Sequence, residues 1–165
     1  MQTSWKLKDY WSGFDYIPLH TYGSLYLGAW ETDEEEILLV EELKKRDINL
    51  IVGLGFKTHP IDRFSYRCQT ITVDIEDFPD SDTKMKKFLE YTLEKIHIAL
   101  ISGSNVYVHC HAGISRSSTV VIAYLMKYYD YSYNEALQYV RTHRPQVRPN
   151  PGFERLLLSF SYDSN

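Results

Sequence analysis

The chain has 165 residues, of which 44% are hydrophobic and 24% are charged, so it can bury one core and is too short for two ordinary domains. Its formal net charge of −4 argues against nucleic acid as a partner, because binding to a phosphate backbone depends on clustered Lys and Arg. There is no N-terminal apolar signal and no apolar run of the roughly 18 residues that span a bilayer. With only two cysteines, we expect free thiols, a cytoplasmic or nuclear location and no membrane partner.

Apolar runs alternate with helical patterns along the first half of the chain, which predicts an α/β fold. Residues 1–20 form an aromatic extension, whose 5–16 segment is expected to be a packed strap, with a substrate-recognition lip as the alternative. A short strand is predicted at 24–27. A helix at 33–46 begins with acidic residues and ends with basic ones, as the helix dipole favours. A buried strand follows at 48–54.

The second half continues the alternation and ends in helices. The predicted elements are a strand at 69–75 with an acidic turn after it, a helix at 83–100, a strand at 105–109, a helix to about 129, a helix from the capping box Ser132-x-x-Glu135 to about 144, and a final helix from Pro151 to 158 capped by Asn150. We therefore expect one α/β domain over residues 1–165. Its central mixed sheet should have about four or five strands flanked by helices, with Cys110 at the carboxyl end of a central strand.

The strand at 105–109 runs directly into His-Cys-His-Ala-Gly-Ile-Ser-Arg-Ser, residues 109–117, before a helical pattern. A loop between a buried strand and a helix N-terminus presents several backbone N–H groups to one point, and the helix dipole adds positive potential. Gly113 permits a close turn, and Arg116 supplies a planar fork suited to phosphate oxygens. The sequence therefore predicts a phosphate-binding loop of His111, Ala112, Gly113, Ile114, Ser115 and Arg116.

A thiol at the first position of this loop lies in a field that favours the thiolate. Cys110 could attack phosphorus in line and form a phosphocysteine, while the loop amides and Arg116 hold the developing charge. Ser117 is placed to hydrogen-bond the sulfur as it leaves in the second step. His109 is expected to brace the loop, with its side chain pointing away from the substrate. A structural cysteine beside a helix-capping loop is the alternative to this chemistry.

The pattern His-Cys-x-x-Gly-x-x-Arg-Ser resembles the signature of the cysteine-based protein tyrosine phosphatases, and Ala-Gly-Ile-Ser-Arg-Ser resembles their dual-specificity branch, of the small, atypical type. Similar stretches at 25–28, 121–126 and 144–153 extend the resemblance over roughly residues 20–160. The resemblance implies a protein tyrosine phosphatase-like fold. It also implies hydrolysis of phosphotyrosine and phosphoserine or phosphothreonine in protein substrates, without a metal or other cofactor.

The resemblance also implies a carboxylic acid on a loop some thirty residues before the cysteine, because the departing oxygen needs a proton. Asp74, Asp77, Asp80 and Asp82 all lie there. We choose Asp77, because residues 73–77 resemble the family's hydrophobic strand that ends in an aspartate. Asp80 remains the alternative; Asp74 falls inside the strand pattern, and Asp82 suits a helix cap.

Four further residues have two interpretations each. Cys68 is expected to be a small buried strand residue, with a disulfide to oxidised Cys110 as the alternative. Arg144 is a candidate for the rim of the pocket, where it would take a second phosphate or an acidic substrate segment. Arg141 and Arg148 are weaker candidates for the same role. All three arginines suit a helix C-terminus equally well.

Two other functions remain open. The same chemistry could act on a non-protein phosphate, such as a phosphoinositide, an RNA 5′ end or a phosphorylated glucan. Relatives that resemble lipid phosphatases carry lysines between the cysteine and the arginine, whereas here the intervening residues are His-Ala-Gly-Ile-Ser, and only His111 departs toward a loop with a basic side chain. The chain could also be a phosphate-reading module without catalysis, but such proteins usually lack the cysteine or the arginine. The oligomeric state is left open.

Overall fold

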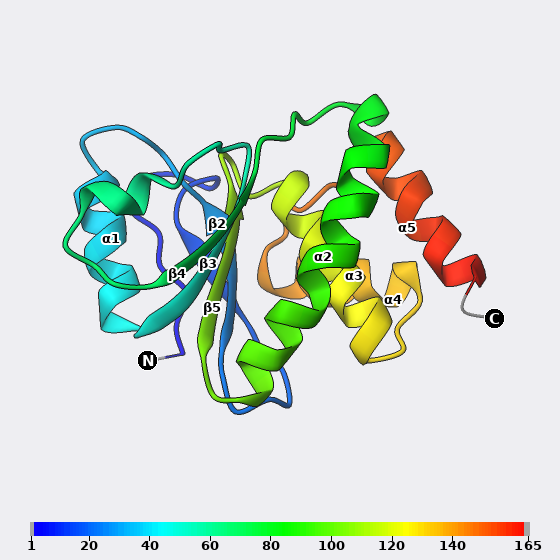
Figure 1. Cartoon of the computed structure of the whole chain (residues 1–165), viewed down its shortest axis with the longest axis horizontal. Helices are drawn as coiled ribbons and strands as arrows, with labels where there is room; N and C mark the ends of the chain where they lie inside the picture. The colour runs from blue at the N-terminus through cyan, green and yellow to red at the C-terminus, as the bar shows by residue number, and fades with distance from the viewer. Residues whose placement is uncertain (1, 164–165) are drawn as a thin grey trace.

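Five strands form one mixed sheet in the computed structural model, which describes residues 2–163 (Figure 1). They are β1 (Phe14–Ile17), β2 (Leu25–Ala29), β3 (Ile48–Leu54), β4 (Gln69–Val73) and β5 (Asn105–Cys110), in the spatial order β1-β2-β5-β3-β4. The last four strands are parallel, and β1 pairs antiparallel with β2. The predicted α/β fold with a mixed sheet of four or five strands is confirmed.

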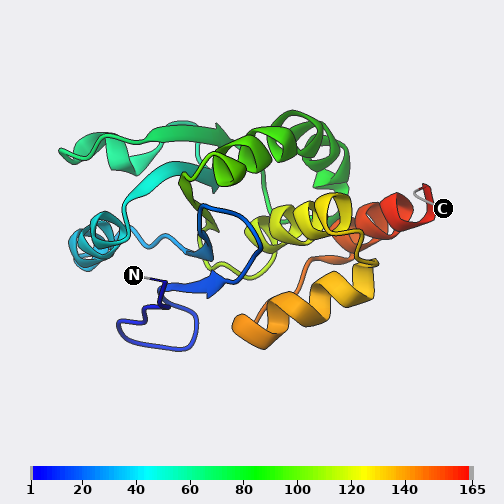
Figure 2. The same ribbon diagram turned by 90° about the horizontal axis from the view of Figure 1, so that it is seen from below.

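Helices cover both faces of this sheet. In Figure 1, α1 (Glu36–Lys45) lies on one face, and α2 (Asp82–Ile101), α3 (Arg116–Tyr128), α4 (Tyr133–His143) and α5 (Pro151–Asp163) gather on the other. Figure 2 shows the same separation from below. One hydrophobic cluster fills the layer between the sheet and α2–α5, and a second fills the layer under α1. Two short 3₁₀ helices, η1 (Pro60–Arg63) and η2 (Pro79–Ser81), lie in the connections around β4.

The helix boundaries follow from local side-chain caps. The capping box before α4 is confirmed, because the Ser132 hydroxyl accepts a hydrogen bond from the Glu135 N–H (3.1 Å) and the Glu135 carboxylate accepts one from the Ser132 N–H (2.9 Å). Asn150 caps α5 by accepting from the Phe153 N–H at 2.9 Å. The helix α1 begins three residues later than predicted, because the Asp33 carboxylate accepts from the Glu35 N–H and forms a turn there instead.

The N-terminal segment contains a strand that the sequence analysis did not predict. Trp5 and Phe14 exchange two backbone hydrogen bonds of 2.9 Å, so the residues between them form a closed loop. Gly13 has φ 75°, and a Cβ there would lie 1.9 Å from the Trp5 carbonyl oxygen, so only glycine fits. Phe14 and Ile17 are fully buried. Residues 12–15 and Ile17 are therefore packed on the sheet, and β1 supplies its antiparallel edge strand, whereas Tyr10 and Trp11 in the loop before them are 52% and 47% exposed.

The carboxyl ends of the parallel strands meet at the upper edge of the sheet in Figure 1. The strand β5 occupies the middle of the sheet, and five of its six residues are buried, as expected for a strand with neighbours on both sides and helices on both faces. Its last residue is Cys110, and the loop after it leads into α3. Within the described residues, no helix is long and apolar enough to cross a membrane.

Candidate active site

The predicted phosphate-binding loop closes tightly between β5 and α3. Gly113, at its centre, has φ 68°, and a Cβ there would lie 2.5 Å from the backbone of Gly28 and 2.6 Å from the Arg144 guanidinium. The loop therefore needs glycine for both its conformation and its close packing on β2. The thirteen residues of α3 follow at once, so the positive end of that helix faces the loop.

The Cys110 sulfur lies at the base of this loop, and the residue as a whole is 2% exposed. It accepts a hydrogen bond from the Gly113 N–H at 3.3 Å, and the Ser117 hydroxyl lies 3.1 Å from it. Donors at this distance stabilise negative charge on sulfur. The structure thus brings Cys110 and Ser117 into the contact that the sequence predicted.

Arg116 is half-buried beside the loop and is held from one side only. Its Nη1 donates to the Ile75 carbonyl at 3.1 Å. Its Nε is buried and has no hydrogen-bond partner among the residues that the structure describes. Gly55, at φ 100°, makes room for it, because a Cβ there would lie 2.5 Å from Nη1. An unpaired buried guanidinium N–H is costly, and a phosphate oxygen would satisfy it.

Asp77 lies against the same loop. Its Oδ1 accepts a hydrogen bond from the Ser115 hydroxyl at 2.6 Å and another from the Asn150 amide at 2.9 Å. Ser115 in turn accepts from the Asn150 N–H at 3.0 Å. The carboxyl group is thus fixed by the loop on one side and by the start of α5 on the other. Sequence reasoning did not identify Ser115 and Asn150 as its partners.

Among the described residues, the side chains of the other three candidate aspartates form no hydrogen bond with the loop. Asp74 follows β4, is exposed, and uses its backbone carbonyl to accept from Lys84. Asp80 is exposed within η2, and Asp82 begins α2. Of the four carboxylates, only Asp77 is hydrogen-bonded to the loop in the part of the chain that the structure describes.

His109 points into the core, away from the open side of the loop, as predicted. It is 0% exposed; its Nδ1 lies 3.2 Å from the Cys110 carbonyl oxygen, and its Nε2 lies 2.6 Å from Nε2 of His59. Burial and the neighbouring His59 hold the pKa of His109 well below its ordinary value. The sequence analysis did not identify His59. The only local sign of it is a polar residue before Pro60, in a segment for which no role was predicted.

The prediction that Arg144 lines the rim of the pocket is wrong. Arg144 is 0% exposed and lies behind the loop. It donates to the carbonyl oxygens of Gly113 (2.8 Å), Ala112 (3.1 Å) and Trp11 (2.9 Å), and it pairs with the Asp15 carboxylate at 2.9 Å. Each of its three guanidinium nitrogens therefore takes part in joining the loop to the N-terminal segment, and the fully buried side chain is out of reach of a substrate.

Replacing Arg144 with methionine is expected to lower the free energy of unfolding by about 3 kcal/mol, because carbonyl groups and a buried carboxylate lose their donors. Urea denaturation of the two proteins would measure this. Arg148→Met is the matched control, since Arg148 is exposed and a surface change of this kind costs at most about 0.5 kcal/mol. Equal losses in the two variants would contradict the structural role of Arg144.

Arg141 and Arg148 do lie near the loop. Both line a cavity of about 350 Å³ whose wall also includes Asp77, Ile114 and Ser115. The Arg148 N–H is anchored to the Ile114 carbonyl at 2.8 Å. Among the described residues, no ion pair is formed by the Arg148 side chain. These two arginines, rather than Arg144, are placed where an acidic group next to the loop would meet them.

A disulfide between Cys68 and Cys110 does not fit the sheet. Cys68 is half-buried and precedes Gln69, which pairs with Leu50, and Leu50 pairs with Val106. Cys110 is four residues further along β5, roughly 13 Å along the strand direction, whereas disulfide formation needs Cα atoms within about 7 Å. Burial also raises the pKa of the Cys68 thiol to about 11. The interpretation of Cys68 as a packed strand residue agrees with this position.

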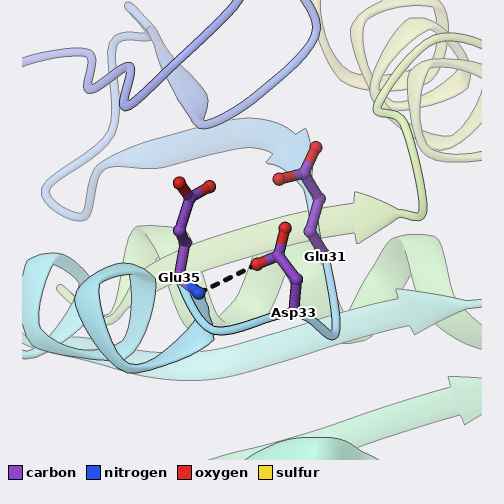
Figure 3. A group of neighbouring side chains, drawn as sticks. All are labelled: Glu31, Asp33 and Glu35. Carbon is purple, nitrogen blue, oxygen red and sulfur yellow. Dashed lines mark hydrogen bonds between the residues drawn. The ribbon is translucent and has the colours of Figure 1, made fainter.

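Three carboxylates converge near the start of α1, at Glu31, Asp33 and Glu35 (Figure 3). The Lys8 ammonium lies 3.0 Å, 2.6 Å and 2.9 Å from them, respectively. The cluster therefore already surrounds a cation from the N-terminal segment. We interpret it as a clamp that holds this segment rather than as a metal centre.

The comparisons with known proteins agree with this geometry. Residues 25–163 match the family model for the dual specificity phosphatase, catalytic domain. The chain belongs to this family, whose members are cysteine-based protein tyrosine/serine/threonine phosphatases. The resemblance to dual-specificity phosphatases that the loop motif indicated is thus confirmed.

Two curated relatives and one solved structure illustrate the similarity. Dual specificity protein phosphatase 15 of Rattus norvegicus is 33% identical over 141 residues, which are 84% of this chain and 55% of that protein. Protein phosphatase Slingshot of Drosophila melanogaster is 32% identical over 145 residues, 87% of this chain and 13% of that protein. The human tyrosine phosphatase-like serine/threonine/tyrosine-interacting protein has a TM-score of 0.75 at 28% identity, covering 92% of this chain and 97% of that one. The chain spans about half or less of the length of these two curated relatives.

Proposed function

We propose that this chain hydrolyses phosphate monoesters on proteins, at phosphotyrosine and at phosphoserine or phosphothreonine, through a phosphocysteine on Cys110. One observation carries the proposal: a single loop contains a hydrogen-bonded sulfur and a buried arginine N–H without a partner among the described residues, and it also donates a hydrogen bond to the carboxyl group of Asp77. These are the nucleophile, the anion-binding group and the proton donor that such a reaction needs.

In the first step the Cys110 sulfur attacks phosphorus in line, so that the S–P bond forms and the P–O bond to the substrate residue breaks. Arg116 and the loop amides bind the equatorial oxygens, where negative charge develops. Asp77 donates its proton to the departing oxygen. Its Oδ1 already accepts two hydrogen bonds, so we assign the transferred proton to Oδ2.

In the second step a water molecule attacks the phosphocysteine. The Asp77 carboxylate now takes a proton from that water, the S–P bond breaks, and its electron pair returns to sulfur. The Ser117 hydroxyl, 3.1 Å from the sulfur, donates a hydrogen bond to the thiolate as it leaves. Inorganic phosphate is released, and no cofactor takes part in this scheme.

Two features support a protein substrate. No lysine lies between Cys110 and Arg116, in contrast to relatives that resemble lipid phosphatases. The cavity lined by Arg141 and Arg148 adjoins Asp77 and Ser115, so an acidic or phosphorylated residue near the target residue would find a cationic partner there. Both cysteines are free, which supports a proposed cytoplasmic or nuclear location.

The function is tested by phosphate release from matched phosphotyrosine and phosphothreonine peptides, with chelator present. The same assay uses a phosphoinositide, a 5′-phosphorylated RNA and a phosphorylated glucan. We expect kcat/KM for the peptides to exceed that for each non-protein substrate by at least about tenfold, a difference of roughly 1.4 kcal/mol in transition-state binding.

Each of the other outcomes identifies an alternative. Turnover of a small aryl phosphate without turnover of either peptide would contradict the protein substrate and keep the chemistry. Binding of phosphate without any turnover would leave a phosphate-reading module.

A further inference from the structure

Two imidazole rings meet in the core beneath the catalytic loop. His59 comes from the segment before η1 and His109 from β5, fifty residues apart, and their Nε2 atoms lie 2.6 Å from each other. His59 is 3% exposed and His109 is 0% exposed. The Trp30 ring packs against both, with centroids 4.6 Å and 5.1 Å away. Ring nitrogens buried in this way need hydrogen-bond partners.

The sheet provides the space for this pair at a glycine. Gly53, on β3 beside β5, has no side chain. A Cβ there would lie 3.0 Å from His109 Nε2 and 3.0 Å from His59 Cδ2, which is tighter than ordinary packing allows. The register pairs Gly53 with His109 across the two strands. The two rings can therefore contact each other only because a glycine lies beside them in the centre of the sheet.

The hydrogen bonds assign the tautomer of each ring. The Ile61 N–H donates to His59 Nδ1 at 3.0 Å, so the proton of a neutral His59 is on Nε2. His59 Nε2–H therefore donates to His109 Nε2, which places the proton of His109 on Nδ1. That N–H donates to the Cys110 carbonyl oxygen at 3.2 Å. The result is a series of hydrogen bonds that all run in one direction, from the Ile61 N–H through the two rings to the carbonyl group of Cys110.

The last hydrogen bond of this series, from His109 to the Cys110 carbonyl, helps to orient the first peptide unit of the loop. The Cys110 carbonyl also accepts from the Trp30 N–H at 2.9 Å, so two donors hold it toward the core. In a planar trans peptide the C=O and the next N–H point in opposite directions. The N–H of His111 therefore points away from these two donors, and we take that side to be the one on which an anion binds.

Burial keeps both rings neutral near pH 7. Burial lowers the pKa of His59 to about 4, and burial with the nearby His59 keeps the pKa of His109 well below its ordinary value. Unfolded imidazoles take up protons below about 6.5, so stability from the pair is complete above that pH and falls as the pH drops toward 4. The surrounding titratable or charged groups are His111, Arg116, Tyr107, and Glu36 with Arg63 behind Trp30.

We infer that His59 is a positioning residue for the phosphatase reaction, which holds His109 in the tautomer that fixes the Cys110 carbonyl and so directs the first phosphate-binding amide of the loop. His59 touches no substrate and acts only through His109. The inference rests on the proposed function of the loop. It adds to that function a residue from outside the loop motif.

Two variants of similar chemistry separate this role from packing. In His59→Asn the side-chain oxygen can still accept from the Ile61 N–H, but the side chain is too short to reach His109. In His59→Gln the longer amide can donate to His109. We expect His59→Asn to lower kcat on a small aryl phosphate about tenfold, as the loss of one buried hydrogen bond allows, with KM changed less than about threefold. We expect His59→Gln to recover most of that loss.

A second readout does not depend on turnover. The time profile of Cys110 alkylation by iodoacetamide at one fixed pH is expected to slow at least about threefold in His59→Asn, because the first amide of the loop is no longer held where it stabilises negative charge on sulfur. The control is His97→Asn, which also removes a ring-nitrogen hydrogen bond, but one that joins α2 to Tyr124 on α3, eight residues beyond Arg116, and does not involve His109 or Cys110. We expect it to leave both readouts unchanged.

Three results would overturn the inference. The first is a His59→Asn variant with wild-type kcat and a wild-type alkylation profile. The second is equal impairment of the Asn and Gln variants, which would assign His59 to packing alone. The third is an equal effect of the His97 control. If the wild type hydrolyses no phosphate at all, the proposed function fails, and the alkylation profiles still decide the role of His59.

Discussion

Replacing Cys110 with serine is expected to abolish phosphatase turnover, with a loss in kcat of at least about 10⁴-fold, because a hydroxyl in this position stays protonated and is a poor nucleophile. Arg116 and the loop amides are untouched by the change, so the variant should still bind phosphorylated substrate. We therefore expect a substrate-binding protein without turnover. Phosphate release measures the first effect, and peptide binding by fluorescence anisotropy measures the second.

The chain offers a matched control for this substitution in its other cysteine. Cys68→Ser makes the same chemical change at the start of β4, at the opposite end of the sheet from the loop. It should keep turnover within about twofold, as expected for a residue that does not take part in the reaction. If Cys110→Ser keeps more than about 1% of the wild-type kcat, Cys110 is not the nucleophile.

Replacing Asp77 with asparagine is expected to lower kcat on phosphopeptides by about 10² to 10³, because the departing oxygen loses its proton donor. The amide oxygen can still accept the hydrogen bonds from Ser115 and Asn150, so the loop should keep its geometry. The basic limb of the kcat profile should disappear. The loss should be much smaller for an aryl phosphate with a good leaving group, which needs little protonation.

Asp80→Asn is the comparison that makes this prediction decisive. Asp80 is exposed within η2, three residues away, and forms no hydrogen bond to the loop in the described part of the chain. Its variant should keep a kcat and a pH profile like those of the wild type. If Asp80→Asn loses the basic limb and Asp77→Asn keeps it, the general acid is Asp80 and the geometric argument for Asp77 fails.

Local sequence patterns were enough to predict most of the strands and helices. Four of the five strands could be located because their apolar runs are bounded by polar turns, and β3 was predicted with its exact limits. The capping box at Ser132 and the Asn150 cap were visible because a cap lies within three residues of the groups it satisfies. The strand β1 was missed because its four residues lie at the end of an aromatic segment and acquire strand character only by pairing with β2.

The sequence by itself determined the core of the candidate site. Residues 109–117 are contiguous, so the order strand, loop, helix was enough to predict the contact of Cys110 with Ser117 and the turn at Gly113. The chemistry of a thiol at a helix N-terminus needs no long-range information. The sequence analysis also expected the His109 side chain to point away from the substrate, and His109 lies fully buried in the core.

Only the tertiary structure determined which residues contact residues 109–117 of the site. Asp77 is 38 residues from Ser115, Asn150 is 73 residues from Asp77, and Arg144 is 129 residues from Asp15. Such contacts depend on which segments the sheet brings to its carboxyl edge, and an arginine at a helix end has the same local pattern whether it faces a substrate or the core. Arg144 was misplaced for this reason. His59 was overlooked because a histidine in a loop gains a role only when the fold sets it 2.6 Å from another ring.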